Sequence, residues 1–190
     1  MRAGDKRIYT RKGDKGRTGL LSGESVRKDD TRVEAYGVLD ELQCHLGTAR
    51  ALVESESVRS IILSLQEDIF SASAELASVP ESRISLKKRI GEVDISRIEK
   101  WIDEFQESHG SPGRFVIPGE SVDSAALHTA RAVCRRGERA IVRLSLESKG
   151  LELLLTYFNR MGDLIFVLAW AVEVEAIVTR TVANVLERSL

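Results

Sequence analysis

Residues 58–76 read VRSIILSLQEDIFSASAEL and place their apolar side chains three and four residues apart. That period matches one face of an α-helix rather than the alternating faces of a β-strand. Pro80 follows shortly after the last apolar position, as is common beyond a helix end. The stretch therefore predicts a long amphipathic helix, whose apolar face must be covered by other elements.

Four further segments carry the same period, and strand signals are few. Thr31 and Glu34 match a capping box, and Asp94 and Ser121 are candidate caps of later helices. The predicted helices cover residues 32–54, 58–76, 94–109, 121–147 and the chain from about 150 onward, the last with or without a break. We expect an all-α single domain over residues 1–190, an antiparallel five-helix bundle (31–190) after an irregular segment (1–30).

The composition supports a globular protein with an uneven charge distribution. The 190 residues are 43% hydrophobic, which is too apolar for a disordered chain. The formal net charge of −1 argues against wholesale nucleic-acid binding. Residues 1–32, however, hold ten Lys or Arg and five Asp or Glu, so a segment of charge +5 precedes a body of charge −6.

Targeting and redox signals point to the cytoplasm. The N-terminus lacks the apolar region of a signal peptide, and the apolar run 164–172 is too short to span a bilayer. We therefore expect no membrane partner. Cys44 and Cys134 form no disulfide framework, and we expect both to be small core residues.

The basic leader contains the stretch YTRKGDKGRTG at residues 9–19, with glycines at 13, 16 and 19. We expect a loop here, with a short strand at residues 7–10. Inward-facing amides together with Lys and Thr donors favour a polyphosphate ligand. The stretch is not a Walker A loop, and the alternative is a flexible basic tail.

Polar side chains interrupt the predicted helices at helical spacing. Arg131, Arg135 and Glu138 share one face, so the two guanidiniums can converge on one anion and Glu138 can orient one of the guanidiniums. The alternative is a solvated basic face. Asn159 and Asp163 are four residues apart, and either face solvent or line a pocket.

Other candidate residues carry weaker signals. Asp40 lies on a helix face with small residues, and if buried it needs a cation such as an arginine of the fourth helix. His128 lies one turn before Arg131, where we expect a packed or solvated side chain. The three histidines are scattered, so the sequence predicts no metal site held by protein side chains.

Four blocks in order resemble one family, the PduO-type ATP:cob(I)alamin adenosyltransferases. They are IYTRKGDKGRTG at 8–19, KDDTRVEAYGVLDEL at 28–42, FVIPG at 115–119 with ARAVCRRGER at 130–139, and FNRMGDLIFVLA at 158–169. The resemblance implies a helical bundle assembled as a homotrimer with active sites between subunits. It also implies transfer of the 5′-deoxyadenosyl group of ATP to the cobalt(I) of reduced cobalamin, releasing triphosphate. A non-catalytic, ATP-responsive cobalamin-binding or delivery protein remains the alternative.

The same resemblance implies roles for individual residues. Arg131 and Arg135 would act on the triphosphate, and Asp40 would pair with Arg131 across the subunit boundary. Phe115 would lie beside the corrin and exclude its lower axial ligand, with Phe166 in the same apolar wall. The implied ATP site comprises Thr10, Arg11, Lys12, Gly13, Lys15, Thr18, Gly19, Lys28, Arg131, Arg135, Glu138 and Asn159.

The implied cofactor is Mg²⁺, carried on the phosphates largely by ATP and water. The implied partners are an electron-donor flavoprotein and an adenosylcobalamin-dependent enzyme. Five positions depart from the family pattern: Glu120 stands where glycine is common, Gly137 where alanine is usual, Gly162 where serine is frequent, Trp170 where arginine is frequent, and Arg17 where threonine or another small residue is frequent.

Overall fold

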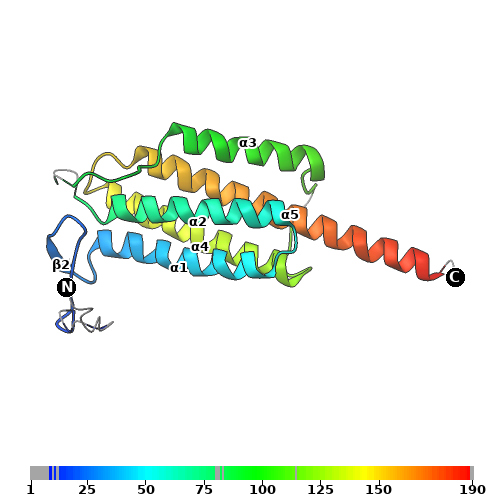
Figure 1. Cartoon of the computed structure of the whole chain (residues 1–190), viewed down its shortest axis with the longest axis horizontal. Helices are drawn as coiled ribbons and strands as arrows, with labels where there is room; N and C mark the ends of the chain where they lie inside the picture. The colour runs from blue at the N-terminus through cyan, green and yellow to red at the C-terminus, as the bar shows by residue number, and fades with distance from the viewer. Residues whose placement is uncertain are drawn as a thin grey trace, which may run out of the picture.

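The computed structural model describes Tyr9, Arg11, residues 13–79, Ser82, residues 84–113 and residues 115–188. Its elements in chain order are β1 (Arg17–Gly19), β2 (Ser25–Arg27), α1 (Thr31–Leu52), α2 (Glu56–Leu76), α3 (Glu92–His109), α4 (Val122–Ser145) and α5 (Glu152–Arg188). The described part of the chain contains five helices, which Figure 1 shows roughly aligned, so the expected all-α bundle is confirmed there.

The helices pack through one continuous apolar core. α1 packs against α2 and α4, and α5 packs against α4 and α3. Leu39 and Leu42 on α1, Ile62 on α2, and Tyr157 and Phe158 on α5 are among its fully buried side chains. The apolar side chains that recur every three or four residues thus form helix faces, and these faces cover one another in the core.

α1 and α4 run antiparallel in close contact. Gly137 lies in α4 where an added Cβ would come within 3.0 Å of Leu39 Cδ2 in α1. At the end of the pair, the Thr31 hydroxyl lies 2.9 Å from a carboxylate oxygen of Glu147. These two contacts set the register of α1 along α4, which places the beginning of α1 beside the end of α4.

A small antiparallel hairpin precedes the bundle, and the sequence pattern did not predict it. Thr18 in β1 pairs with Val26 in β2. The turn between them is fastened to the end of α2, because the Leu21 amide donates to the Ala77 carbonyl at 2.8 Å. The strand expected at residues 7–10 falls on positions of which only Tyr9 is described.

Several predicted helix ends and one burial were wrong. The N-cap of α1 is Asp30, whose carboxylate accepts from the Arg32 amide at 2.9 Å, so Thr31 is already helical. α3 begins at Glu92, and Asp94 accepts from the Gly91 amide at 3.0 Å from inside the first turn. Cys44 is exposed rather than in the core, since it lies on the outer face of α1.

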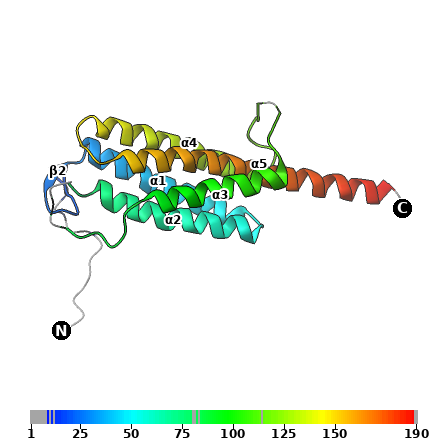
Figure 2. The ribbon, with the colours of Figure 1, turned by 90° about the horizontal axis from the view of Figure 1, so that it is seen from above.

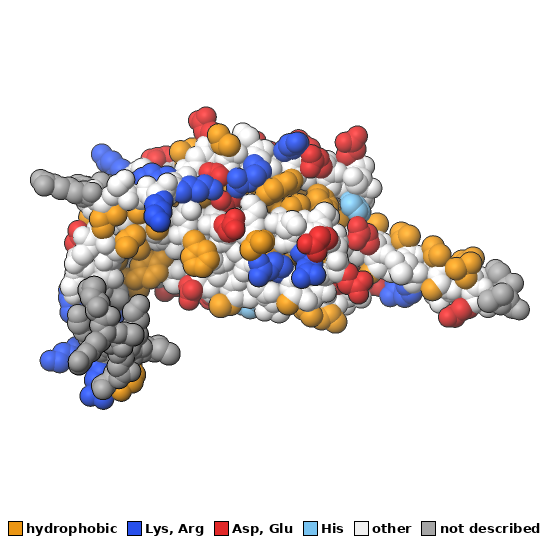
Figure 3. All heavy atoms as spheres, viewed as in Figure 1, with side chains coloured by type: hydrophobic (Ala, Val, Ile, Leu, Met, Phe, Trp, Pro, Cys, Tyr) orange, Lys and Arg blue, Asp and Glu red, His pale blue; other side chains and the backbone are white. Residues whose placement is uncertain are grey.

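The C-terminal part of α5 projects beyond the other helices. α5 is one unbroken helix of 37 residues. Figure 2 shows its end extending past the bundle, beside the loop that joins α3 to α4. Apolar side chains appear along this projection in Figure 3. Val178 and Val182 are exposed apolar residues of this part of α5.

A buried polar cluster ties α2, α3 and α5 together. The Asp68 carboxylate is almost fully buried and accepts from Lys88 and from the Tyr157 hydroxyl, both at 2.6 Å. Arg97 also binds Asp68, and Asp94 pairs with Lys88 at 3.0 Å and with Arg97 at 3.1 Å. Two acids therefore meet two bases, which offsets the cost of burying Asp68.

The Tyr157 hydroxyl is locked in its donor state. Burial first, and then the charge of Asp68, raise the pKa of Tyr157 well above its ordinary value. The phenol therefore stays protonated and can keep donating to the carboxylate.

Replacing Tyr157 with phenylalanine should destabilise the protein, because one buried acceptor site of Asp68 loses its donor. The expected loss is about 1.5–3 kcal/mol in the free energy of unfolding, the usual range for a hydrogen bond to a charged group. Urea unfolding of Tyr157→Phe measures it. Tyr36→Phe is the control, since the half-buried Tyr36 makes no side-chain hydrogen bond within the described residues. Equal small losses in both variants would contradict the role of the cluster.

Candidate functional site

Two adjoining pockets lie between α3, α4 and α5. The first has a volume of about 820 Å³ and is bounded by α3, the loop after it, and α5. The second, of about 530 Å³, is bounded by α3, α4 and α5. Both are lined by Gln106, Arg131, Phe166 and Val167. Arg131 therefore stands at the boundary of the two.

Arg131 makes an aromatic contact within the described residues. Its guanidinium carbon lies 5.5 Å from the centroid of the Phe166 ring, a cation–π arrangement. Its Nε is buried and makes no hydrogen bond within the described residues. A buried guanidinium donor without an acceptor is costly, so this group is suited to an anion or acceptor from outside the chain segment described.

Arg135 follows one turn later and lines the second pocket. The neighbouring arginines point elsewhere: Arg136 pairs with Glu41 of α1, and Arg139 lines a separate groove between α1 and α4. The structure thus separates the Arg131–Arg135 pair from the other basic residues of α4.

Glu138 binds an amide. Asn159 Nδ2 donates to Glu138 Oε1 at 3.1 Å, which joins α5 to α4 beside the second pocket. Arg160 continues this chain of contacts, since its Nη1 lies 3.5 Å from Asn159 Oδ1 and its Nε donates to Glu99 at 3.0 Å. Glu138 therefore orients Asn159, whereas the sequence pattern suggested that it would orient Arg131 or Arg135.

Aromatic side chains form one wall of the first pocket. Phe115, on the loop between α3 and α4, is fully exposed, and Phe166 on α5 is half-buried. Both line the same pocket, together with Trp170. The structure brings the two expected phenylalanines together, and it adds an indole that the sequence argument had not placed in the site.

His128 packs beside this wall. It is 5% exposed, its ring centroid lies 6.0 Å from that of Phe166, and neither ring nitrogen has a hydrogen-bond partner within the described residues. Burial first, and then the charge of Arg131, lower the pKa of His128 below its ordinary value of 6.5. The expectation of a packed side chain is confirmed, and the imidazole is neutral at pH 7.

The residues expected in the leader gather around the hairpin. The Lys28 amide donates to the Gly16 carbonyl at 2.9 Å, and the Lys28 ammonium lies 3.2 Å from where a Cβ on Gly13 would be. Thr18 and Gly19 lie in β1, and Lys15 is exposed. Arg11 has a φ of 60° and stacks on Tyr9 at 5.4 Å. Thr10 and Lys12 lie outside the described residues.

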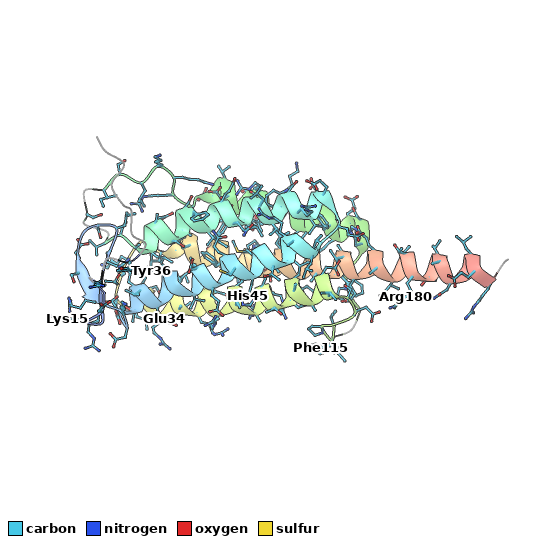
Figure 4. All side chains as sticks on the ribbon, turned by 60° about the horizontal axis from the view of Figure 1, so that its bottom comes forward. Lys15, Glu34, Tyr36, His45, Phe115 and Arg180 are labelled. Atoms are coloured by element: carbon cyan, nitrogen blue, oxygen red, sulfur yellow. The ribbon has the colours of Figure 1, made fainter. Side chains whose placement is uncertain are left out.

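Within one chain, the hairpin lies far from Arg131. Thr31, which follows the hairpin, touches Glu147, and Arg131 lies 16 residues before Glu147. At about 1.5 Å per helical residue the separation along α4 is roughly 24 Å. Figure 4 shows Lys15 at one end of the bundle and Phe115 toward the other.

Asp40 is also remote from Arg131 within the chain. It is exposed and follows Leu39, which lies level with Gly137 rather than with Arg131. No ion pair joins Asp40 to an arginine in the part of the chain that the structure describes. If the two residues meet, a second subunit must bring them together.

The described residues offer little for other chemistries. They contain no group of three or more His, Cys, Asp or Glu side chains that could hold a metal ion. Cys134 is buried and its thiol lies 3.5 Å from the Phe158 carbonyl, and burial raises its pKa, so it is a poor nucleophile. No described helix combines the length and the apolarity needed to cross a membrane.

His128 should titrate below pH 6.5, because burial and Arg131 both disfavour its charged form. The unfolded chain then binds more protons than the folded one, so this residue lowers stability as the pH falls through 6.5. NMR of the ring C–H signals measures the midpoint, and His128→Gln assigns the signal by its loss. A midpoint at or above 6.5 would contradict the environment described.

Comparison with known proteins identifies the family. The model of the cobalamin adenosyltransferase family matches residues 8–172. A corrinoid adenosyltransferase of Citrobacter freundii is 41% identical over 163 residues, which are 86% of this chain and 93% of that protein. The corrinoid adenosyltransferase PduO of Salmonella typhimurium is 36% identical over 183 residues, which are 96% of this chain. The match covers 54% of that protein, so this chain spans about half its length.

A solved structure agrees in fold. It is a variant of the PduO-type ATP:corrinoid adenosyltransferase from Lactobacillus reuteri, complexed with cobalamin and ATP. It has a TM-score of 0.83 and 31% identity, and the match covers 90% of this chain and 96% of that one. Since the family model covers most of the chain and the relatives agree with it, the chain belongs to the cobalamin adenosyltransferase family and is a corrinoid adenosyltransferase of the PduO type.

Proposed function

We propose that the two adjoining pockets hold the two substrates of adenosyl transfer to cob(I)alamin. The triphosphate of ATP would bind Arg131 and Arg135 beside the second pocket, and the corrin would lie against Phe115 and Phe166 in the first. The observation that carries this proposal is the position of Arg131 on the boundary of both pockets. A reaction between the two ligands needs such a shared boundary.

The reaction asks the protein for position and charge rather than for a nucleophile. The electron pair of cobalt(I) forms a bond to the 5′ carbon of ATP, and the carbon–oxygen bond breaks with its pair leaving on the triphosphate. Arg131 and Arg135 would stabilise the growing negative charge, each by a few kcal/mol when well placed. Asn159, held on Glu138, would orient the nucleotide.

The hairpin would supply the remaining contacts to ATP. Lys28 already lies over Gly13, and Lys15 is exposed beside it, so two ammonium groups are available to phosphate oxygens. The proposed contacts from this segment are those expected from the sequence: Thr10, Arg11, Lys12, Gly13, Lys15, Thr18, Gly19 and Lys28. Mg²⁺ would arrive on the triphosphate, held mainly by ATP and water.

Phe115 would act on the lower face of the corrin. Its side chain is fully exposed on a loop at the first pocket, which is an unfavourable place for a phenyl ring unless a ligand or subunit covers it. By occupying the lower axial side it would exclude the lower ligand. A four-coordinate cobalt(II) is then easier to reduce by an external electron donor, for which a flavoprotein is suited.

The site would be completed by another copy of the chain, in a homotrimer. In one subunit the hairpin lies roughly 24 Å from Arg131 along α4. The exposed Asp40 and the half-buried Arg131 likewise need a second chain to meet. A cyclic assembly would bring the hairpin and Asp40 of one subunit to the arginines of the next, once for each subunit. The product would pass to an adenosylcobalamin-dependent enzyme.

Arg131→Ala should largely abolish adenosyl transfer while leaving the helical content unchanged, because it removes the charge at the boundary of both pockets. Incubation with ATP, Mg²⁺ and chemically reduced cobalamin without oxygen, followed by absorbance, measures the rate. We expect a loss of about 10²-fold or more, the range for removing one such stabilising group. Arg139→Ala is the control on the same helix. Near-normal turnover by Arg131→Ala would refute its role.

The wild-type protein tests the reaction itself in the same assay. Formation of adenosylcobalamin with release of one triphosphate supports the proposal. Stoichiometric binding of ATP and cobalamin without triphosphate release would replace it with the delivery function.

Two inactive variants should restore one another if the site is shared. Asp40→Ala and Arg131→Ala subunits, co-expressed with different tags and purified through both, would form some boundaries with both residues intact. In a mixed trimer purified through both tags, about one third of the boundaries carry both intact residues. Activity well above that of either variant alone is expected. No recovery in a verified mixed oligomer would place both residues in one subunit's site.

A further inference from the structure

Trp170 occupies the outer end of the aromatic wall. It lies on α5 one turn after Phe166, so the two side chains project from the same side of the helix. It is half-buried and lines the first pocket with Phe115 and Phe166. The neighbouring Ala169 and Ala171 are buried in the core, whereas the indole lies at the pocket.

The polar edge of the indole is already satisfied. Trp170 Nε1 donates to the carbonyl oxygen of His109 at 3.2 Å, and His109 is the last residue of α3. The last carbonyls of a helix have no partner within the helix, so this bond satisfies a donor and an acceptor together. What Trp170 offers to the pocket is therefore an apolar aromatic surface.

Residues of both α3 and α5 fix the orientation of the Trp170 indole. His109 stacks on Phe105 with ring centroids 5.6 Å apart, and its Nε2 lies 3.2 Å from Glu175 Oε1. The acceptor of the indole is thus held by both α3 and α5. A side chain locked in this way loses little further freedom when a ligand covers it.

The chemistry of the pocket is divided along its length. Arg131 and Phe166 border both pockets, whereas Phe115 and Trp170 line only the first pocket, which Arg135 does not line. A phosphate belongs at the charged boundary. A broad, flat, largely apolar ring system belongs on the aromatic wall, where it buries area on three rings.

We infer that Trp170 is a corrin-binding residue that extends the wall formed by Phe115 and Phe166. The inference rests on the proposed function, since it takes the first pocket as the corrin side. Because its N–H is already bonded to His109, the indole offers apolar contact area to the edge of the corrin. It makes no hydrogen bond to the amide groups at the corrin periphery. It therefore contributes to affinity for the corrin ring and leaves ATP binding alone.

A purely structural role makes a different prediction. If Trp170 only braces α3 against α5, its contribution lies in the bond to His109, and any residue lacking the N–H loses it. If the ring contacts the corrin, phenylalanine retains most of the contribution and alanine does not. The pair Trp170→Phe and Trp170→Ala separates the two roles.

The experiment measures KM for cob(I)alamin, KM for ATP and kcat, together with the Kd for cob(II)alamin in the presence of ATP, by absorbance without oxygen. For Trp170→Ala we expect KM and Kd for the corrinoid to rise about tenfold, as when an aromatic anchor is truncated, with KM for ATP within about twofold. For Trp170→Phe we expect a rise below about threefold. Phe70→Ala, which removes an exposed aromatic ring from α2, should change none of these.

Two results would overturn the inference. One is an unchanged corrinoid Kd in a folded Trp170→Ala protein. The other is an equal loss in Trp170→Phe and Trp170→Ala, accompanied by an equal drop in the melting temperature. Failure of the proposed function looks different, because the wild-type protein would then neither bind cob(II)alamin with ATP nor form adenosylcobalamin.

Discussion

The close antiparallel contact of α1 and α4 is the constraint on which the rest of the molecule depends. A Cβ added at Gly137 would lie 3.0 Å from Leu39 Cδ2, so the two helices pack closely in this register. That register puts the hairpin and Thr31 at one end, beside Glu147, and leaves Arg131 well along α4. The charge division of the sequence thereby becomes a spatial division, with the basic leader at one end and the paired arginines elsewhere.

α3 lines both pockets and is held by an apolar face as well as by polar contacts. Asp68 and Tyr157 fasten its first half through Arg97, and the indole of Trp170 fastens its last carbonyl. Few α3 residues are fully buried, Ile98 being one. These polar contacts, together with the apolar face of α3, hold α3 beside α5 at the pockets.

Much of this could be read from residue spacing, and the failures have local causes. The helices were predicted because apolar residues recur every three or four positions, and Arg131 and Arg135 share a face for the same reason. The hairpin was missed because strands of three residues carry no usable alternation. Cys44 was wrongly assigned to the core, because the sequence alone does not show which face of α1 the other helices cover. Trp170 and Arg160 were not expected in the site, since their roles come from contacts 61 positions away in sequence.

The sequence by itself determined the helical class, the family and the chemical character of the site, because these follow from period, motif and residue type. Only the tertiary structure decided that Arg131 borders two pockets, that Arg136 and Arg139 face away from them, and that the hairpin lies far from both. The physical reason is that helix faces are defined by local spacing, whereas the packing register between helices depends on steric contacts such as that of Gly137 with Leu39.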